Sequence, residues 1–355
     1  MGSLKSKLKN AVFDLPAPIL RKVLVARRLK SHPNEIEECI EIFSPASLSD
    51  KQKDALSKCI LADMHNHLIT PDEYFLYDFA DKTESEKDEY VGDMERELLC
   101  ARIYNNTPSG LIFMDKMKTY DNFSPFFKRD IIGISSEEDF YDYDEFVKTH
   151  PEYMVKPAAA SRGNGIRKEK SSETEEERLE DFVRILDSGK AVVEEIIDQS
   201  EEMSALHPES VNTVRFATFL KDGEPITLAC FVKIGRGSSV VDNGGAGGFL
   251  AAVDEETGII TTPGRTEHGE IVEIHPDTGI HIEGYQLPDW ENLRRLMYEL
   301  PQVLPDQPYV GWDLAHSATK GWVLVEGNSG GQFVGPQISR KQGIRELINL
   351  TFGRL

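Results

Sequence analysis

The sequence predicts an α+β protein in which a helical N-terminal region precedes a region of mixed helices and strands. Up to about residue 105, apolar residues recur three and four positions apart among Glu, Lys, Leu and Ala, which is the helical pattern. From about Ile112, short β-branched runs are separated by Gly, Asn, Asp and Pro turns. The chain has 355 residues and is 39% hydrophobic and 28% charged, so it can bury a core without disulfide bonds or a structural metal ion. Helices followed by a mixed region indicate α+β architecture.

The first 30 residues are basic, with eight Lys or Arg residues and one acid. Their apolar positions predict two short amphipathic helices, broken by Pro16 and Pro18. A basic amphipathic segment can contact an anionic membrane surface as a peripheral anchor. It can also dock on the acidic body of its own chain, which is the commoner case. Both interpretations stay open at this point.

Three further helices are expected in the predicted N-terminal region, residues 1–108, namely 35–43, 50–69 and 85–104. The second contains Asp63, His65 and His67. Two histidines two positions apart face different sides of a helix and cannot share a metal ion. We therefore expect these histidines to be structural or exposed.

Beyond residue 108 the strand pattern predicts two β-containing subdomains, residues 109–190 and 191–355. Charged residues 168–180 predict a mobile loop that leads into a solvated helix. Helices are expected at 174–188 and 293–300, and the expected strands are 153–155, 191–197, 213–219, 226–232, 249–253, 272–274, 309–310 and 322–325.

The formal charge of −21 argues against nucleic acid as a partner, because such a chain repels a phosphate backbone. No apolar run reaches the length of about 18 residues that a membrane span requires, and no apolar signal-peptide core is evident. The four cysteines form no C-x-x-C pair, which fits reduced thiols. We therefore expect a cytoplasmic protein.

The clearest chemical motif lies in a predicted hairpin near the C-terminus. Asp313 ends one strand, and Glu326 and Asn328 end the next, with a turn at 317–321. Glu326 and Asn328 are two positions apart on an extended segment, so their side chains project to the same side. Two carboxylates and an amide oxygen that converge form a hard oxygen site suited to Mg²⁺ and nucleotide phosphates.

A second motif is a strand that ends at Lys156 and continues into a small-residue loop with Ser161, Gly163 and Gly165. Backbone N–H groups of such a loop can close on phosphate oxygens while the lysine neutralises them. An ordinary glycine-rich turn gives the same pattern. The loop is not a Walker A motif, because no Gly-Lys-Ser/Thr closes it.

Cations and glycines gather around a predicted hairpin of residues 213–219 and 226–232. Arg215 near its start, with Lys233 and Arg236 just past its end, lies at one end of that hairpin. Asp242, Asn243 and four glycines follow and predict a loop whose backbone can approach a ligand closely. We expect Arg215 to serve a phosphoryl group, and Lys233, Arg236, Asp242 and Asn243 to bind an acid substrate; solvated surface cations are the alternative.

Taken together, these motifs resemble the ATP-grasp superfamily, and Asp313, Glu326 and Asn328 are similar to the magnesium triad of D-alanine–D-alanine ligases. The resemblance implies two β-containing subdomains that clamp ATP. It makes Lys116 and Lys156 the two phosphate-binding lysines. It also assigns the segment with Glu194, Glu195 and Ile197 to an adenine-binding linker and Glu201 or Glu202 to the ribose.

Within the superfamily, the chain resembles the sugar-transfer-associated ATP-grasp proteins of polysaccharide biosynthesis over roughly residues 70–335. That group usually has an arginine where this chain has Lys233, and a lysine cannot form a bidentate fork with a carboxylate. The shared motifs include Val155-Lys156-Pro157, Ser210-Val211-Asn212-Thr213-Val214-Arg215, His275-Pro276-Asp277-Thr278-Gly279 and Gly311-Trp312-Asp313 with Glu326-Gly327-Asn328.

The resemblance implies an ADP-forming, ATP- and Mg²⁺-dependent carboxylate–amine ligase that acts through an acylphosphate. Its substrates would be a small acid and an amine, with a glycan or another sugar-linked acid as the target. Arg215 and Lys156 would be the catalytic cations. Two alternatives stay open. One is a phosphotransferase on a hydroxyl substrate, and the other is a nucleotide-binding component of a glycan assembly complex without turnover.

Overall fold

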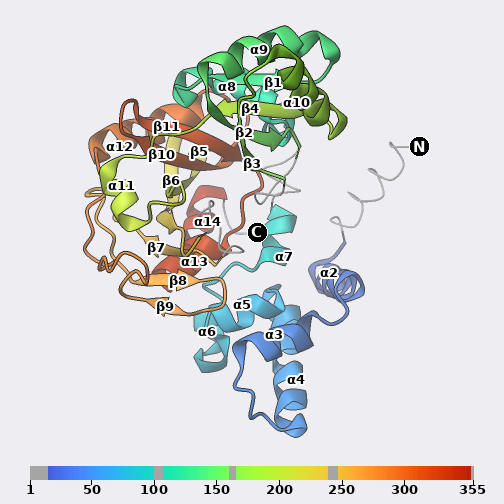
Figure 1. Cartoon of the computed structure of the whole chain (residues 1–355). Coiled ribbons are helices and arrows are strands. Elements are labelled where there is room, and N and C mark those ends of the chain that lie inside the picture. The colour runs from blue at the N-terminus through green and yellow to red at the C-terminus, as the bar shows by residue number, and fades with distance from the viewer. Residues whose placement is uncertain (1–14, 100–106, 160–164, 239–246, 353–355) are drawn as a thin grey trace.

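The computed structural model in Figure 1 describes residues 15–99, 107–159, 165–238 and 247–352. A helical region lies at the bottom of the view, a large sheet in the middle and a smaller sheet with its helices at the top. This arrangement confirms the α+β prediction. Within the described residues, none of the helices combines the length and apolarity that a bilayer crossing requires.

The helical N-terminal region buries its own apolar cluster. In α2, the side chains of Leu20, Leu24 and Val25 are buried in a cluster with Ile60 and Met64 of α4. This half of the basic segment therefore packs on the chain itself; residues 1–14 lie outside the described residues. The helices here are α2 (Ala17–Ser31), α3 (Glu35–Phe43), α4 (Asp50–His67), α5 (Pro71–Leu76), η2 (Phe79–Asp81), α6 (Glu84–Lys87) and α7 (Asp93–Leu99).

The helix expected over residues 85–104 is wrong, because α6 and α7 are separate helices. Between them Gly92 lies so close to α4 that a Cβ atom would stand 2.3 Å from the carbonyl oxygen of Leu68. Leu68 and Gly92 are 24 positions apart, so no local pattern in the sequence could reveal this close approach.

The first sheet has four antiparallel strands in the order β1-β4-β2-β3. Strand β4 was expected to begin the second subdomain, but it lies between β1 and β2, so the first sheet extends to residue 195. Residues 167–170, which overlap the expected mobile loop, form strand β3 on β2. The elements are η4 (Pro108–Met114), α8 (Lys116–Phe127), β1 (Ile131–Ile134), η5 (Glu137–Asp139), α9 (Phe140–Thr149), β2 (Glu152–Pro157), β3 (Arg167–Lys170), α10 (Glu175–Asp187) and β4 (Ala191–Glu195).

The second sheet has seven antiparallel strands in the order β11-β10-β5-β6-β7-β8-β9. The two predicted hairpins, β5–β6 and β10–β11, are both confirmed and lie side by side. The elements are α11 (Glu201–Leu206), β5 (Thr213–Lys221), β6 (Glu224–Ile234), β7 (Phe249–Ala252), β8 (Gly264–Thr266), β9 (Ile271–Val272), α12 (Trp290–Glu299), η7 (Leu300–Gln302), β10 (Tyr309–Ser317), β11 (Gly321–Asn328), α13 (Val334–Arg340) and α14 (Arg345–Phe352).

Helix α8 joins the two sheets. Its Phe123 and Phe127 are buried in the main apolar cluster with Trp312 of β10, and the rings of Phe123 and Trp312 lie 5.2 Å apart. Burial of such aromatic side chains provides much of the packing free energy at the junction. Packing against α8 therefore holds β10 and β11 next to the first sheet.

The helical region is also tied to the C-terminal end of the fold. Gln337 of α13 is buried, accepts a hydrogen bond from the backbone N–H of Val91, and donates to the carbonyl of Val91 and the hydroxyl of Tyr77. Tyr77 in turn donates to Glu73, which is buried and accepts from the backbone N–H groups of Thr70 and Asp93. Buried polar groups satisfied in this way fix the relative position of the two parts.

Candidate active site

The three oxygen-bearing side chains predicted to bind magnesium lie on β10 and β11, in the half of the hairpin away from its turn. Asp313 was expected to end its strand, but β10 continues to Ser317. Asp313 and Glu326 are directly opposite each other in the strand register, as expected from the sequence. The Asn328 amide donates to Glu326 Oε1 at 3.0 Å, so these two side chains point to the same side. The register shifts just beyond Asp313, which places a bulge beside the site. Such bulges redirect neighbouring side chains.

Two cationic side chains singled out in the sequence as candidate site residues contact the Asp313 carboxylate. Arg215 of β5 is in register with Asp313, and its Nε donates to Oδ1 at 2.6 Å while Nη2 donates to Oδ2. Lys233 of β6 lies 3.0 Å from Oδ2. Burial would raise the pKa of Asp313, but Arg215 and Lys233 outweigh it and hold the pKa well below its ordinary value. Asp313 is therefore a fixed negative charge in a buried position.

The first sheet contributes a second charged cluster. Lys156 of β2 donates to Glu194 Oε2 of β4 at 2.7 Å, and Arg129 donates to the same oxygen at 2.8 Å. Glu194 is buried; that burial would raise its pKa, but the two cations lower it from 4.5 to about 2. Arg129 also donates to the carbonyl of Leu324 in β11 at 2.6 Å, so this cluster bridges the two sheets.

Sequence reasoning missed Arg129. It stands between α8 and β1 in the ordinary sequence Lys128-Arg129-Asp130, with no motif around it. Its importance comes from partners 65 and 195 positions away. No local signal distinguishes it from a solvated surface arginine.

Lys116, the other expected phosphate-binding lysine, is the first residue of α8. Its Nζ donates to the carbonyl of Pro157 at 3.1 Å, directly after Lys156, and its backbone N–H donates to the carbonyl of Ala158. Burial lowers the pKa of Lys116, while the charge of Glu326 acts to raise it. The two predicted lysines and the carboxylate of Glu326 therefore belong to one electrostatic environment.

The segment after β4 crosses from the first sheet to the second. Lys320 holds both oxygens of Glu195, at 2.6 and 2.7 Å. Beyond Ile197, Asp198 accepts hydrogen bonds from Ser317 and Thr319 in the β10–β11 turn. Glu201 is exposed in the first turn of α11. The segment expected to bind the nucleotide therefore connects the two sheets and is held by the β10–β11 turn.

Other predicted residues are placed differently or lie outside the described residues. Arg236 pairs with Glu270 at 2.9 Å, whereas Lys233 pairs with Asp313, so these two cations have separate carboxylate partners. Gly165 has a positive φ of 74° and lies against Pro157, where a Cβ would stand 2.8 Å from the ring. The other loop residues of the prediction, Ser161, Gly163, Asp242 and Asn243, lie outside the described residues.

Part of the motif around Arg215 has a supporting role. The Asn212 side chain is buried, accepts from the backbone N–H of Gly235 at 3.1 Å, and donates to the carbonyls of Met203 and His207. His275 contacts the carbonyl of Gly235 at 2.9 Å. These groups hold the chain that leads from Lys233 to Arg236 and the glycine-rich segment.

Comparison with protein families gives a match to the family described as "sugar-transfer associated ATP-grasp", over residues 97–351. A search of curated proteins found no match.

Among solved structures, D-alanyl-alanine synthetase A from Vibrio cholerae O1 biovar eltor is similar, with 11% identity and a TM-score of 0.42; 73% of this chain and 67% of that chain are covered. VanG D-Ala:D-Ser ligase from Enterococcus faecalis shares 14% identity, with a TM-score of 0.41 and coverage of 68% and 63%. The ATP-grasp ligase PsnB complexed with a minimal precursor shares 11%, with a TM-score of 0.37 and coverage of 66% and 62%. The chain thus spans somewhat under two thirds of the latter two proteins.

Proposed function

The chain belongs to the sugar-transfer associated ATP-grasp family, and from this premise we propose that it is an ADP-forming, ATP- and Mg²⁺-dependent carboxylate–amine ligase. The observation that carries the proposal is the meeting of two charge clusters across the two sheets. Asp313, Glu326 and Asn328 come from one sheet, and Lys156 comes from the other. Such a meeting of oxygen ligands and cations suits a nucleotide triphosphate with its metal.

The donor set fits magnesium. Two carboxylates and one amide oxygen are hard ligands, and the Glu326 side chain is 46% exposed, so an ion can reach it from solvent. A carboxylate has about four lone pairs; Arg215 and Lys233 take three of those of Asp313, so one remains for an ion. Asp313, Glu326 and Asn328 would hold the ion, which when bound neutralises charge on the phosphates of ATP.

The protein's cations would neutralise the remaining negative charge of the phosphates. Lys116 and Lys156 would bind phosphate oxygens from the side of the first sheet. Arg215, held rigidly by Asp313, would face the γ-phosphoryl group. Since these groups are positioned before the substrate arrives, they stabilise developing charge without reorganisation. The end of β4 and the segment that follows it, with Glu194, Glu195, Ile197 and Glu201, would line the adenine and ribose.

In the proposed reaction, a carboxylate oxygen of the acid attacks the γ-phosphorus, and the bond to ADP breaks. The resulting acylphosphate is attacked at its carbonyl carbon by an amine nitrogen, which loses a proton as phosphate leaves. No protein nucleophile is needed, so positioning and charge stabilisation account for catalysis. Lys233 beside Asp313 suits an acid carboxylate close to the phosphoryl group, and Arg236, Asp242 and Asn243 would complete its site.

The family's description is the support for a sugar-linked acid as substrate. The test is ADP release on mixing the protein with ATP, Mg²⁺ and pools of uronic acids and amino acids, each with and without an amine. We expect ADP release and a condensed product that require both acid and amine. Stoichiometric phosphorylation of a hydroxyl compound without an amine would indicate a phosphotransferase instead. Nucleotide binding without turnover across the pools would favour a non-catalytic role.

A further inference from the structure

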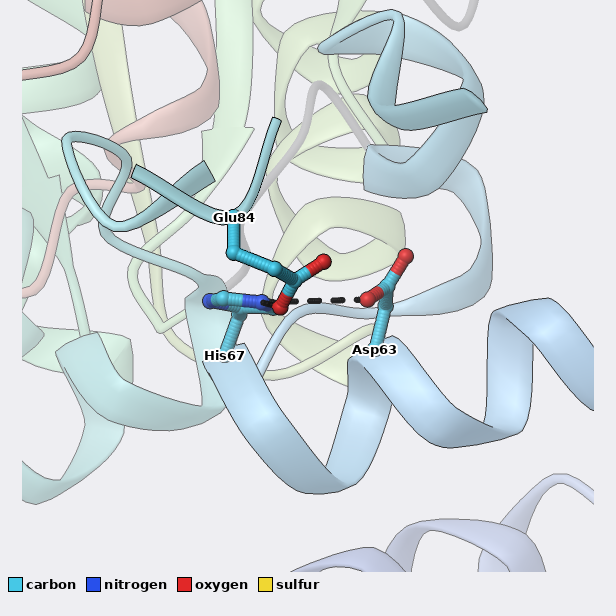
Figure 2. A group of neighbouring side chains, drawn as sticks. All are labelled: Asp63, His67 and Glu84. Atoms are coloured by element: carbon cyan, nitrogen blue, oxygen red, sulfur yellow. Dashed lines mark hydrogen bonds and ion pairs between the residues drawn. The ribbon is translucent and has the colours of Figure 1, made fainter. Parts of the chain in front are cut away.

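A cluster of metal-ligating side chains lies in the helical N-terminal region, away from the ATP site. Figure 2 shows Asp63 and His67 on the last turns of α4, with Glu84 at the start of α6. His65 and His67 face different sides of α4, but Asp63 and His67 are four positions apart and share one face. The Thr83 capping box that starts α6 brings Glu84 across to them.

The three ligand atoms are close enough to share one ion. His67 Nε2 lies 3.2 Å from Glu84 Oε2 and 3.7 Å from Asp63 Oδ1, and all three atoms lie within 4.8 Å of one another. Asp63 and His67 are buried, whereas Glu84 is 68% exposed. The cluster therefore has two fixed ligands and a third that closes it from the solvent side.

His67 has carboxylate oxygens on both sides of its ring. Its Nδ1 lies 3.2 Å from Asp88 Oδ1, while Nε2 faces Glu84 and Asp63. A neutral imidazole carries one N–H donor and one lone pair, and carboxylates only accept hydrogen bonds. If Nδ1 donates to Asp88, the Nε2 lone pair faces two anions at close range. If instead Nε2 donates to Glu84 Oε2, at 3.2 Å, the Nδ1 lone pair faces Asp88. A proton or a metal ion on the ring would remove either conflict.

The charges around the cluster favour the metal ion. Three carboxylates, those of Asp63, Glu84 and Asp88, surround His67, and the one ammonium among them is that of Lys87. Lys87 Nζ contacts Asp63 Oδ2 at 3.0 Å and Glu84 Oε1 at 3.1 Å. Lys87 Nζ also donates to Asp63 Oδ1 at 3.2 Å, and Glu84 Oε2 is the carboxylate oxygen that lies nearest to His67 Nε2, at 3.2 Å. An imidazolium leaves one negative charge uncompensated, whereas a divalent ion compensates both.

A second group of the same composition is less buried. Asp130, His150 and Glu195 also lie within 4.8 Å of one another, and Lys320 holds both oxygens of Glu195 as Lys87 holds both oxygens of Asp63. Asp130 is exposed and His150 and Glu195 are half-buried, whereas Asp63 and His67 are buried. The cluster on α4 and α6 is therefore the better shielded of the two.

We propose that Asp63, His67 and Glu84 bind a divalent transition metal of the Zn²⁺ class. Zinc binds imidazole nitrogen and carboxylate oxygen at about 2.0–2.2 Å, so tetrahedral ligands stand roughly 3.3–3.5 Å apart, close to the separations found here. Water would take the fourth position. Asp88 is the positioning residue, since a carboxylate on the second ring nitrogen is the usual way to orient a zinc-bound histidine.

The ion would act as a structural link. It would join the end of α4 to the start of α6 and so close the intervening segment that contains α5 and η2. Phe79 packs edge-on against His67 with ring centroids 5.6 Å apart, which limits the access of water on that side. Binding there would stabilise the folded state by mass action, independently of nucleotide.

The experiment is a Zn²⁺ titration of the full chain after chelator treatment, by calorimetry and by metal content after gel filtration. A non-hydrolysable ATP analogue with excess Mg²⁺ occupies the nucleotide site. Co²⁺ serves as a second probe, because nitrogen ligation gives visible absorption. We expect one Zn²⁺ per chain in the wild type and in His65→Gln, which changes a histidine outside the cluster.

The variants decide the assignment. Glu84→Gln, at an exposed position that folding does not depend on, should weaken Zn²⁺ binding about 100-fold, and Asp88→Asn about 10–100-fold. His67→Gln should abolish it and the Co²⁺ absorption. Wild-type protein without tight Zn²⁺ binding would overturn the proposal. Binding by Glu84→Gln and His67→Gln equal to that of the wild type would also overturn it.

Discussion

Arg215 and Asp313 are direct neighbours across strands β5 and β10, and the guanidinium donates hydrogen bonds to both oxygens of the buried carboxylate. The sequence assigned one residue to the phosphoryl group and the other to the metal. Their pairing means that a single substitution affects both. It also separates Asp313, whose loss disturbs the fold, from Glu326, whose side chain is 46% exposed.

Glu326→Gln should fold with normal stability and lose ADP formation by about 100-fold or more, because it removes one ligand charge at the opening of the site. Asp313→Asn should lose activity as well. It should also lower the free energy of unfolding by about 3 kcal/mol, since Arg215 and Lys233 are left without their charge partner. Steady-state ADP release and urea unfolding of both variants provide the measurements. Near-normal turnover of Glu326→Gln at saturating Mg²⁺ would contradict the metal assignment.

Lys156→Ala should weaken binding of a non-hydrolysable ATP analogue by about tenfold or more, and Lys156→Arg should not fully restore it. The compact ammonium fits among phosphate oxygens, and Glu194 remains paired with Arg129 in its absence. Calorimetric titration measures the affinity. Lys168→Ala, at a half-exposed lysine on the neighbouring strand β3, is the matched control. Equal affinity of Lys156→Ala and the control would return the loop to an ordinary turn.

Arg129→Ala should destabilise the protein by about 3 kcal/mol, because Glu194 loses a buried partner and the link to β11 is broken. The matched control is Arg295→Ala on α12, whose side chain is 65% exposed and which should change stability by less than about 0.5 kcal/mol. Urea unfolding compares the two. A similar small effect of both substitutions would show that the bridge between the sheets contributes little.

Stability should fall as the solution becomes more acidic, in a range set by Glu194. Its pKa is lowered from 4.5 in the unfolded chain to about 2 in the fold, where Lys156 and Arg129 outweigh the effect of burial. The stabilisation is fully present above pH 4.5 and is lost as the pH falls toward 2, by about 3 kcal/mol in all. Unfolding free energies of the wild type and Glu194→Gln between about pH 3 and 6 test this. Parallel pH dependences of the two proteins would contradict it.

Lys233→Ala and Arg236→Ala should differ in their kinetic effects. Arg236 pairs with Glu270 rather than Asp313, so its loss should raise KM for the acid and leave KM for ATP nearly unchanged. Lys233 contacts Asp313, so its loss should raise KM for the acid and lower kcat as well. Initial rates at varied acid and ATP measure both. An increase of KM for ATP alone in both variants would assign these cations to the nucleotide.

Local pattern was sufficient for several parts of the fold. Helices α3 and α4, both long hairpins and the opposition of Asp313 and Glu326 follow from periodicity and turn residues within short windows. Period-two alternation and a tight turn fix which side chains of a hairpin meet, because partners are close in sequence. The same reasoning failed for α6 and α7, where the single expected helix is interrupted between Lys87 and Asp93 and Gly92 lies against Leu68, 24 positions away.

Long-range packing placed the rest of the site. The partner of Lys156 is Glu194 from the neighbouring strand, Arg129 reaches a carbonyl of the other sheet, and Asp313 is held by cations from β5 and β6. The group of Asp63, His67 and Glu84 likewise forms only when α6 is brought beside α4. Side-chain charges acquire these partners through burial between elements far apart in sequence, and the free energy of such burial depends on the assembled core rather than on any local motif.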